Sequence, residues 1–159
     1  MLTIARRRCP ARRQDVPEVS RLVEVSPADN SDTRPVETLS AITADRCILV
    51  RHRVEAAARR AGLTEDAAAR FTLAVNEILI NAIQHGGGTA DVSIIAGASR
   101  VAVEIRDRGR GMHGRVPDAL PPVDALHGRG LWLARQLCDD VSIHSTGRGV
   151  TVRLGAARA

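Results

Sequence analysis

Small and apolar residues recur at helical spacing in two consecutive stretches of the chain. From Ala44 to Ala61 they return every three or four residues, and Gly62 supplies a stop signal. Thr64, followed by two acidic residues, is typical of a helix N-cap. The helix that it opens runs to about His85 and ends at three glycines. The pattern therefore predicts two amphipathic helices in succession.

Alternating and β-branched residues mark the second half of the chain. Asp91–Ala96 and Arg100–Arg106 predict two strands joined by a short turn, which together form a hairpin. Val141–His144 and Val150–Leu154 predict a second hairpin around a glycine turn. We therefore expect four strands paired mainly with their neighbours in the chain.

A long loop and a short helix separate the two hairpins. The loop, from Asp107 to Arg129, is rich in Gly and Pro, and its length makes it a candidate lid. The helix follows from Gly130 to about Asp139. The order of elements predicts an α+β fold, a two-layer sandwich with helices on one face of a mixed, largely antiparallel sheet.

Composition changes near residue 36. Residues 1–36 are rich in Arg, Pro, Ser and Asp and offer little to bury, so we expect a flexible segment there and the folded domain over 37–156. At 159 residues the chain has room for one such domain. It has 44% hydrophobic residues but one Phe and one Trp, so Ala, Val, Ile and Leu must build its core.

The net charge of +5 is concentrated at one end. Five arginines precede residue 14, and the remaining basic residues equal the 18 acidic residues in number. A nucleic-acid binder is expected to spread cations over a folded face and to offer aromatic platforms for bases. Neither feature is visible, so we expect no direct nucleic-acid partner.

Three further features of the sequence limit which kinds of ligand site and partner the chain can have. Lysine is absent, which excludes a P-loop lysine, so any phosphate site must use backbone amides, arginine and metal. The three cysteines are widely spaced without a C-x-x-C, which predicts reduced thiols in a cytoplasmic protein. No run of eighteen apolar residues occurs, so we expect no membrane partner.

Polar residues form a stripe along the second predicted helix. Glu77, Asn81, Gln84 and His85 fall at i, i+4, i+7 and i+8, and hence on one side of the helix. Taken alone, this stripe is equally typical of the solvent face of an amphipathic helix. Its significance depends on the motifs that follow.

Three glycine-containing motifs come later in the chain. Asp107–Gly111 reads DRGRG at the end of a strand, where glycines permit close backbone approach to a ligand. Gly128–Leu131 reads GRGL at a helix start, where free amides and the helix dipole favour a phosphate. Gly149–Thr151 lies in the final hairpin. Each motif alone is common, since turns, N-caps and strands also produce it.

Together, and in this order, the polar stripe and the three motifs resemble the N, G1, G2 and G3 boxes of the GHKL (histidine-kinase-like, Bergerat-fold) ATPases over about residues 40–155. The residues of the N box, and a lid that is short for this class of ATPase, are most similar to those of the bacterial anti-sigma-factor serine/threonine protein kinases. The resemblance implies ATP and Mg²⁺ as ligands, an anti-anti-sigma protein as phosphorylation substrate and a sigma factor as second partner. It also implies a homodimer, for which the first helix and the early strand are the region to inspect.

The resemblance also implies the roles of individual residues. Asn81 would coordinate Mg²⁺, and Glu77, one turn earlier, would be the general base. Asp107 would accept a hydrogen bond from the adenine amino group, which guanine lacks. The other expected nucleotide-binding residues are His85, Gly109, Gly111, Gly128, Arg129, Gly130, Leu131 and Thr151.

These residues would contribute in different ways. Gly109 and Gly111 would let the lid pass close to the nucleotide, and Gly128 and Gly130 would present amides to the phosphates. Leu131 would anchor the helix behind them, and Thr151 would complete the adenine pocket. Arg129 and His85 have alternative explanations, because an arginine there is also typical of a solvated surface and a histidine there also caps helix carbonyls.

Two other functions are alternatives to a serine/threonine kinase. A histidine kinase core needs a phosphoacceptor histidine on a dimerisation helix, and His52 lacks the expected acidic or proline context. A non-catalytic ATP-binding module that sequesters a partner stays open, because a carboxylate at Glu77 does not by itself demonstrate turnover. The sequence motifs support the ATP site strongly, whereas the partners follow only from analogy with the family.

Overall fold

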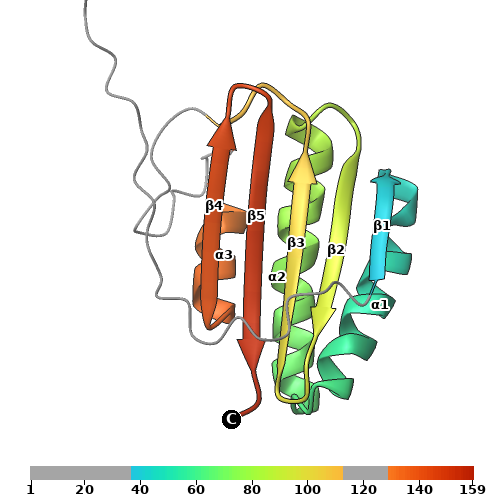
Figure 1. The fold of residues 1–159 in the computed structure, drawn as a ribbon, viewed down its shortest axis with the longest axis vertical. Helices are drawn as coiled ribbons and strands as arrows, with labels where there is room; N and C mark the ends of the chain where they lie inside the picture. Colours follow the sequence, from blue (N-terminus) through green and yellow to red (C-terminus); the bar gives the residue numbers. More distant parts are fainter. Residues whose placement is uncertain (1–36, 113–128) are drawn as a thin grey trace, which may run out of the picture.

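The computed structural model describes residues 37–112 and 129–159. Within them five strands form one sheet in the order β1-β2-β3-β5-β4, and every pairing is antiparallel (Figure 1). The expectation of a largely antiparallel sheet is therefore confirmed. The strands are β1 (Glu37–Ile42), β2 (Ala90–Ala96), β3 (Arg100–Asp107), β4 (Asp140–Thr146) and β5 (Gly149–Ala157).

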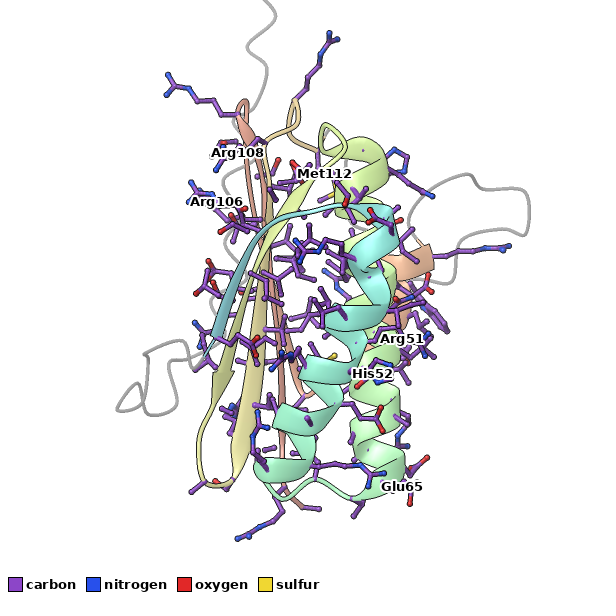
Figure 2. All side chains as sticks on the ribbon, turned by 90° about the vertical axis from the view of Figure 1, so that its right-hand side faces the viewer. Arg51, His52, Glu65, Arg106, Arg108 and Met112 are labelled. Atoms are coloured by element: carbon purple, nitrogen blue, oxygen red, sulfur yellow. The ribbon has the colours of Figure 1, made fainter. Side chains whose placement is uncertain are left out.

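The helices cover one face of this sheet and leave the other face open (Figures 1 and 2). They are α1 (Cys47–Arg60), preceded by the short 3₁₀ helix η1 (Ala44–Arg46), then α2 (Glu65–His85) and α3 (Arg129–Leu137). The predicted two-layer α+β sandwich is confirmed. None of the helices in the described ranges is long and apolar enough to cross a membrane.

Local signals at both ends fix the length of α2. The Thr64 side chain accepts a hydrogen bond from the Ala67 amide at 3.2 Å, which caps the helix as the sequence predicted. At the other end the Gly86 amide bonds to the Ala82 carbonyl, and Gly87 has a φ of +94°. A glycine adopts this left-handed conformation without steric cost, so the chain can turn from α2 towards β2.

The core lies between the two layers and is built largely from small and branched apolar residues, as the composition required. Phe71 of α2 is the largest of its fully buried side chains. Alternation along β3 separates the two faces of the sheet: Val103 and Ile105 are buried under the helices, whereas Arg106 is exposed on the open face. Side chains that pair across neighbouring strands share a face, so register assigns each strand residue to one layer.

Strand β1 was not located by the hydrophobic pattern. Its sequence ETLSAI buries one residue fully, Ile42, so it carries no clear alternation. The strand pairs with β2, with a register shift between Leu39 and Ile42. Ala41 in this irregularity has a φ of +52°, which an alanine rarely adopts, and its amide donates to Asp91 Oδ1 at 2.9 Å. Tertiary pairing therefore defines an edge strand that the local sequence does not.

Other boundaries differ from the predicted ones by a few residues. β4 and β5 each extend beyond the predicted hairpin strands, and α3 ends at Leu137 instead of about Asp139. The predicted flexible segment 1–36 lies outside the described residues, as does most of the predicted lid. Only the first part of that loop, as far as Met112, is described.

Candidate functional site

The polar stripe of α2 faces the start of α3. Glu77 and Asn81 are half-buried, one helical turn apart. Gly130, the second residue of α3, is buried against them: a Cβ placed on it would clash with Asn81 Nδ2 and lie 3.6 Å from Glu77 Cβ. The structure therefore brings Glu77, Asn81 and Gly130 together. The first amides of α3, which have no helical partner, lie at the same place.

Asp107 ends β3 on the helix-covered face and is 8% exposed. Its Oδ1 accepts two hydrogen bonds, from the Gly109 amide at 2.9 Å and from the Val150 amide at 3.2 Å. No group in residues 37–112 or 129–159 donates to Oδ2. One carboxylate oxygen is thus used to hold the loop and β5 in place, and the other remains an acceptor for a ligand.

Three backbone segments converge on Asp107 through glycines. A Cβ on Gly86, at the end of α2, would overlap both Asp107 Cβ and the Ala82 carbonyl. A Cβ on Gly109 would lie 2.8 Å from Gly86 Cα, and one on Gly149 would overlap the Asp107 carbonyl. The end of α2, the loop after β3 and the start of β5 can approach this closely because none of the three glycines has a side chain.

Gly86 and Gly149 are therefore site positions that were not among the predicted nucleotide-binding residues. The sequence held a signal for both, since each is a glycine beside a candidate motif. Nothing local, however, shows that Asp107 is the group each one meets. Gly109 is a predicted nucleotide-binding residue, and in the structure its lack of a side chain lets the loop after β3 approach Gly86 at the end of α2.

The loop after β3 is tied to the β4–β5 hairpin. A Cβ on Gly111, whose φ is +78°, would overlap the Thr146 carbonyl. The Met112 amide donates to Ser145 Oγ at 2.8 Å. A cavity of about 580 Å³ lies at this end of the domain, lined by His85, the loop from Arg108 to Gly111, and Arg148. His85, a predicted ligand residue, therefore lines a cavity bordered by this loop.

Thr151 does not reach the cluster around Asp107. It pairs with Arg106 on β3 and with His144 on β4, both of which are exposed on the open face of the sheet. Paired residues in antiparallel strands point to the same face, so the Thr151 side chain lies on the face opposite to Asp107. Val150, one residue earlier, takes the inward position. A direct adenine contact by the Thr151 side chain does not fit this register.

The remaining predicted residues lie around the start of α3. Arg129 begins the helix, and Leu131 is half-buried and packs against the core, as an anchoring role requires. Gly128 lies outside the described residues. The structure thus brings Gly130 of α3 to Glu77 and Asn81, brings the loop after β3 to the end of α2, and places the Thr151 side chain on the other face of the sheet.

The cysteine thiols do not form a reactive centre in the described ranges. Burial raises the pKa of Cys138 to about 12, with a further contribution from Asp140 and Asp139. Burial also raises the pKa of Cys47 above its ordinary value. Both thiols are protonated at neutral pH and are poor nucleophiles or metal ligands. The part of the chain that the structure describes contains no group of three or more His, Cys, Asp or Glu residues able to hold a metal ion.

Comparison with known proteins identifies similar domains. The profile of the family described as "Histidine kinase-like ATPase domain" matches residues 41–155. Among solved structures, the chain is similar to the RsbU and RsbW domains of Rv1364c from Mycobacterium tuberculosis, with 22% identity and a TM-score of 0.55. That match covers 77% of this chain and 33% of the other, so this chain spans about one third of that protein's structure.

A second similar structure is the catalytic domain of histidine kinase ThkA, with 15% identity and a TM-score of 0.46 over 77% of this chain and 97% of that one. No curated protein matches the chain. At 22% identity, the RsbU and RsbW structure establishes a shared fold.

Proposed function

This chain belongs to the histidine kinase-like ATPase domain family, and from that membership we propose that it is an ATP-dependent serine/threonine protein kinase of the anti-sigma type. Its proposed substrate is a hydroxyl group on an anti-anti-sigma protein, and its second partner is a sigma factor. The proposed catalytic domain is 37–156. The shared fold with a structure that contains an RsbW domain is compatible with this choice.

The packing of Gly130 against Asn81, with Glu77 one turn away, is the observation that best supports this function. Phosphoryl transfer depends mainly on positioning and on neutralising the charge of the phosphates. A carboxylate, an amide side chain and the first amides of a helix within one small volume meet those needs. All three lie on regular helices, which hold them rigidly.

The described residues also fit the two ligands. Mg²⁺ prefers oxygen ligands and is commonly shared between one or two protein groups and substrate phosphates. The Asn81 amide oxygen is one such group, and this arrangement needs no larger cluster of acidic residues. Asp107 Oδ2 is an acceptor that suits the amino group of adenine, while Oδ1 holds the loop through the Gly109 amide.

The residues divide the work as follows. Mg²⁺, when bound, would neutralise the negative charge of the phosphates. Asn81 would hold the ion, and the amides at the start of α3 would bind phosphate oxygens. Glu77 would receive the proton of the attacking hydroxyl. Asp107 would select adenine, because the guanine carbonyl at the corresponding position is not a donor.

The proposal is tested first by calorimetric titration of Mg-ATP and Mg-GTP. We expect saturable binding of ATP but not of GTP, and about tenfold to hundredfold weaker ATP binding in Asp107→Asn, the range for a lost hydrogen bond to a charged group. The variant's amide oxygen can still accept from Gly109 and Val150, so the loop is retained and its NH₂ would face the adenine amino group. If Asp107→Asn binds ATP like the wild type, the adenine assignment is wrong.

Kinase activity is tested separately with Glu77→Gln. We expect this variant to bind Mg-ATP normally and to lose phosphoryl transfer to the partner protein. The control is Glu104→Gln, because Glu104 is half-buried and lies on the open face of the sheet, opposite Arg153 in the register of β3 and β5. Normal ATP binding with no transfer by the wild type would instead favour the non-catalytic, partner-sequestering module.

A further inference from the structure

One large apolar side chain is exposed on the helix that carries Glu77. Leu73 is 47% exposed, whereas the other large exposed hydrophobic residues of the described ranges, Ile48 and Leu49, lie near the start of α1. Leu73 precedes Glu77 by four residues, so the two side chains lie on the same side of α2, one turn apart. The proposed base therefore has an accessible apolar neighbour on the side that faces the start of α2.

Two further apolar side chains near Glu77 are incompletely covered. Ile80, three residues after Glu77 on α2, is half-buried, and so is Leu133 of α3. Leu133 follows Gly130 by three residues and shares the side of α3 that packs against α2. The surroundings of this carboxylate are therefore apolar along α2 and towards α3.

The direction of α3 decides where Leu133 lies along α2. The two helices lie side by side under the sheet, and the first turn of α3 meets the end of α2 (Figure 1). The last turn of α3 leads to β4 at the end of the sheet where the C-terminus lies, and there Arg158 packs against Gly62, just before α2. The helices are therefore antiparallel, and Leu133 lies on the Leu73 side of Glu77.

Closer to the start of α2, the same side of the helix carries a closed ion pair. Arg70 and Asp66 are 3.0 Å apart, with side chains that are 57% and 77% exposed. Such a solvated pair contributes little binding energy and presents no isolated charge. A partner that covers Leu73 would therefore meet an apolar surface bordered by neutralised charge.

The spacing along α2 limits how a substrate segment can use this surface. The acceptor hydroxyl must reach Glu77, which is one helical turn, about 5.4 Å, from Leu73. In an extended segment, alternate side chains point the same way and are about 6.6 Å apart. A side chain two positions from the acceptor hydroxyl would therefore lie over Leu73.

We propose that Leu73, with Leu133 beside it, is the docking surface for the acceptor segment of the substrate protein. This segment carries a large apolar residue two positions from the serine or threonine that is phosphorylated. The inference rests on the kinase function proposed above and adds a sequence preference of its substrate. Leu73 takes no part in the chemistry, so its loss changes substrate binding and leaves the transfer step intact.

Two synthetic peptides test this preference. One is Ala-Leu-Ala-Ser-Ala-Leu-Ala, and the other has alanine in place of both leucines. Transfer from radiolabelled Mg-ATP by the full chain gives kcat and KM for each peptide. We expect a KM at least about tenfold lower for the leucine peptide, the difference expected for burying one leucine side chain.

Leu73→Ala should remove this difference between the peptides. We expect its KM for the leucine peptide to rise at least about tenfold with kcat unchanged, since a contact equally strong in the ground and transition states affects KM alone. The matched control is Leu49→Ala, because Leu49 is also an exposed leucine but lies on α1. Equal KM values of the wild type for the two peptides, or an equal rise in Leu49→Ala, would overturn the docking surface.

Fluorescence anisotropy of the labelled leucine peptide, measured with Mg-ATP present, separates docking from catalysis. Binding that is lost in Leu73→Ala, with no phosphoryl transfer by the wild type, would remove the kinase function and leave the docking surface in place. Absence of peptide binding to the wild type would show that Leu73 is an ordinary solvated side chain.

Discussion

The two ends of the sandwich use glycine in different ways. At the end that carries the site, glycines meet backbone atoms and Asp107, as Gly86 and Gly149 do. At the other end, where α1 leads to α2, a Cβ on Gly62 would meet the Arg158 side chain at 2.9 Å. A flexible arginine can move aside, whereas a backbone carbonyl and a buried carboxylate cannot. Gly86 and Gly149 are therefore packed against groups that cannot yield, and substitutions at these two glycines are expected to have the larger effects.

The largest effect is expected for Gly86→Ala. Its new Cβ would overlap both Asp107 and the Ala82 carbonyl, so α2 and β3 would have to separate. We expect a loss of about 3 kcal/mol in the free energy of unfolding, the upper part of the range for overpacking. Urea unfolding measures it, with Gly87→Ala as the control. Gly87 has nothing within 4 Å but a φ of +94°, so about 1 kcal/mol is expected. Equal losses would contradict the described contact.

Gly130→Ala is expected to affect binding more than stability. Its Cβ would push the Asn81 side chain aside, while alanine itself favours the helix. We expect Mg-ATP to bind at least about tenfold more weakly, as for one lost contact to a charged ligand, with little change in unfolding. Calorimetry and urea unfolding together measure both quantities.

Gly147→Ala is the control for this substitution, since Gly147 has open space around it and no left-handed φ. Normal Mg-ATP binding by Gly130→Ala would show that Asn81 does not need its described position.

Much of α2, the helix that carries the site, was predictable because its signals are local. Thr64, the glycines after His85 and the i, i+4 spacing of Glu77 and Asn81 all lie within one helix. The family resemblance implies that Asn81 and Gly130 both serve the nucleotide, but their close contact with each other could not be worked out from the sequence. Such contacts depend on how α3 packs against α2.

The features that could not be predicted from the sequence depend on strand register and on long-range packing. Strand β1 is defined by pairing with β2, and its own residues carry little hydrophobic signal. Thr151 was assigned to the adenine pocket, but a shift of one residue along a strand changes the face of the sheet. The cavity at the end of α2 is lined by the loop after β3 and by the β4–β5 turn, which are nearly forty residues apart in the chain, and no local pattern shows that they meet.

A smaller effect is expected at high pH from Cys138, which follows α3. Burial raises the pKa of its thiol to about 12 from an ordinary value of 9.0. The unfolded chain therefore loses this proton before the native state does. The stability contribution is fully present below about pH 9 and is lost as the pH rises towards 12.

Cys138→Ala tests this dependence, because the variant and the wild type keep the same other thiols and neither has lysine or tyrosine to titrate in the same window. We expect the free energy of unfolding to fall less steeply between pH 9 and 12 in the variant than in the wild type. Identical slopes in urea unfolding would show that this thiol is not protected by the fold.

The smallest effect is expected for Thr151→Val, which tests the two faces of the sheet. Because Thr151 pairs with exposed Arg106 on the open face, its hydroxyl should contribute nothing to nucleotide binding, and valine suits a strand equally well. Calorimetry should give a Mg-ATP affinity within about twofold of the wild type, well below the tenfold that corresponds to 1.4 kcal/mol.

Val150→Glu is the contrasting variant, because it places a negative charge beside Asp107 on the covered face, where like charges repel in a poorly solvated environment. We expect it to weaken Mg-ATP binding strongly. A loss of ATP binding in Thr151→Val as strong as the loss expected for Asp107→Asn would contradict the described register between β3 and β5, because it would place the Thr151 hydroxyl at the adenine.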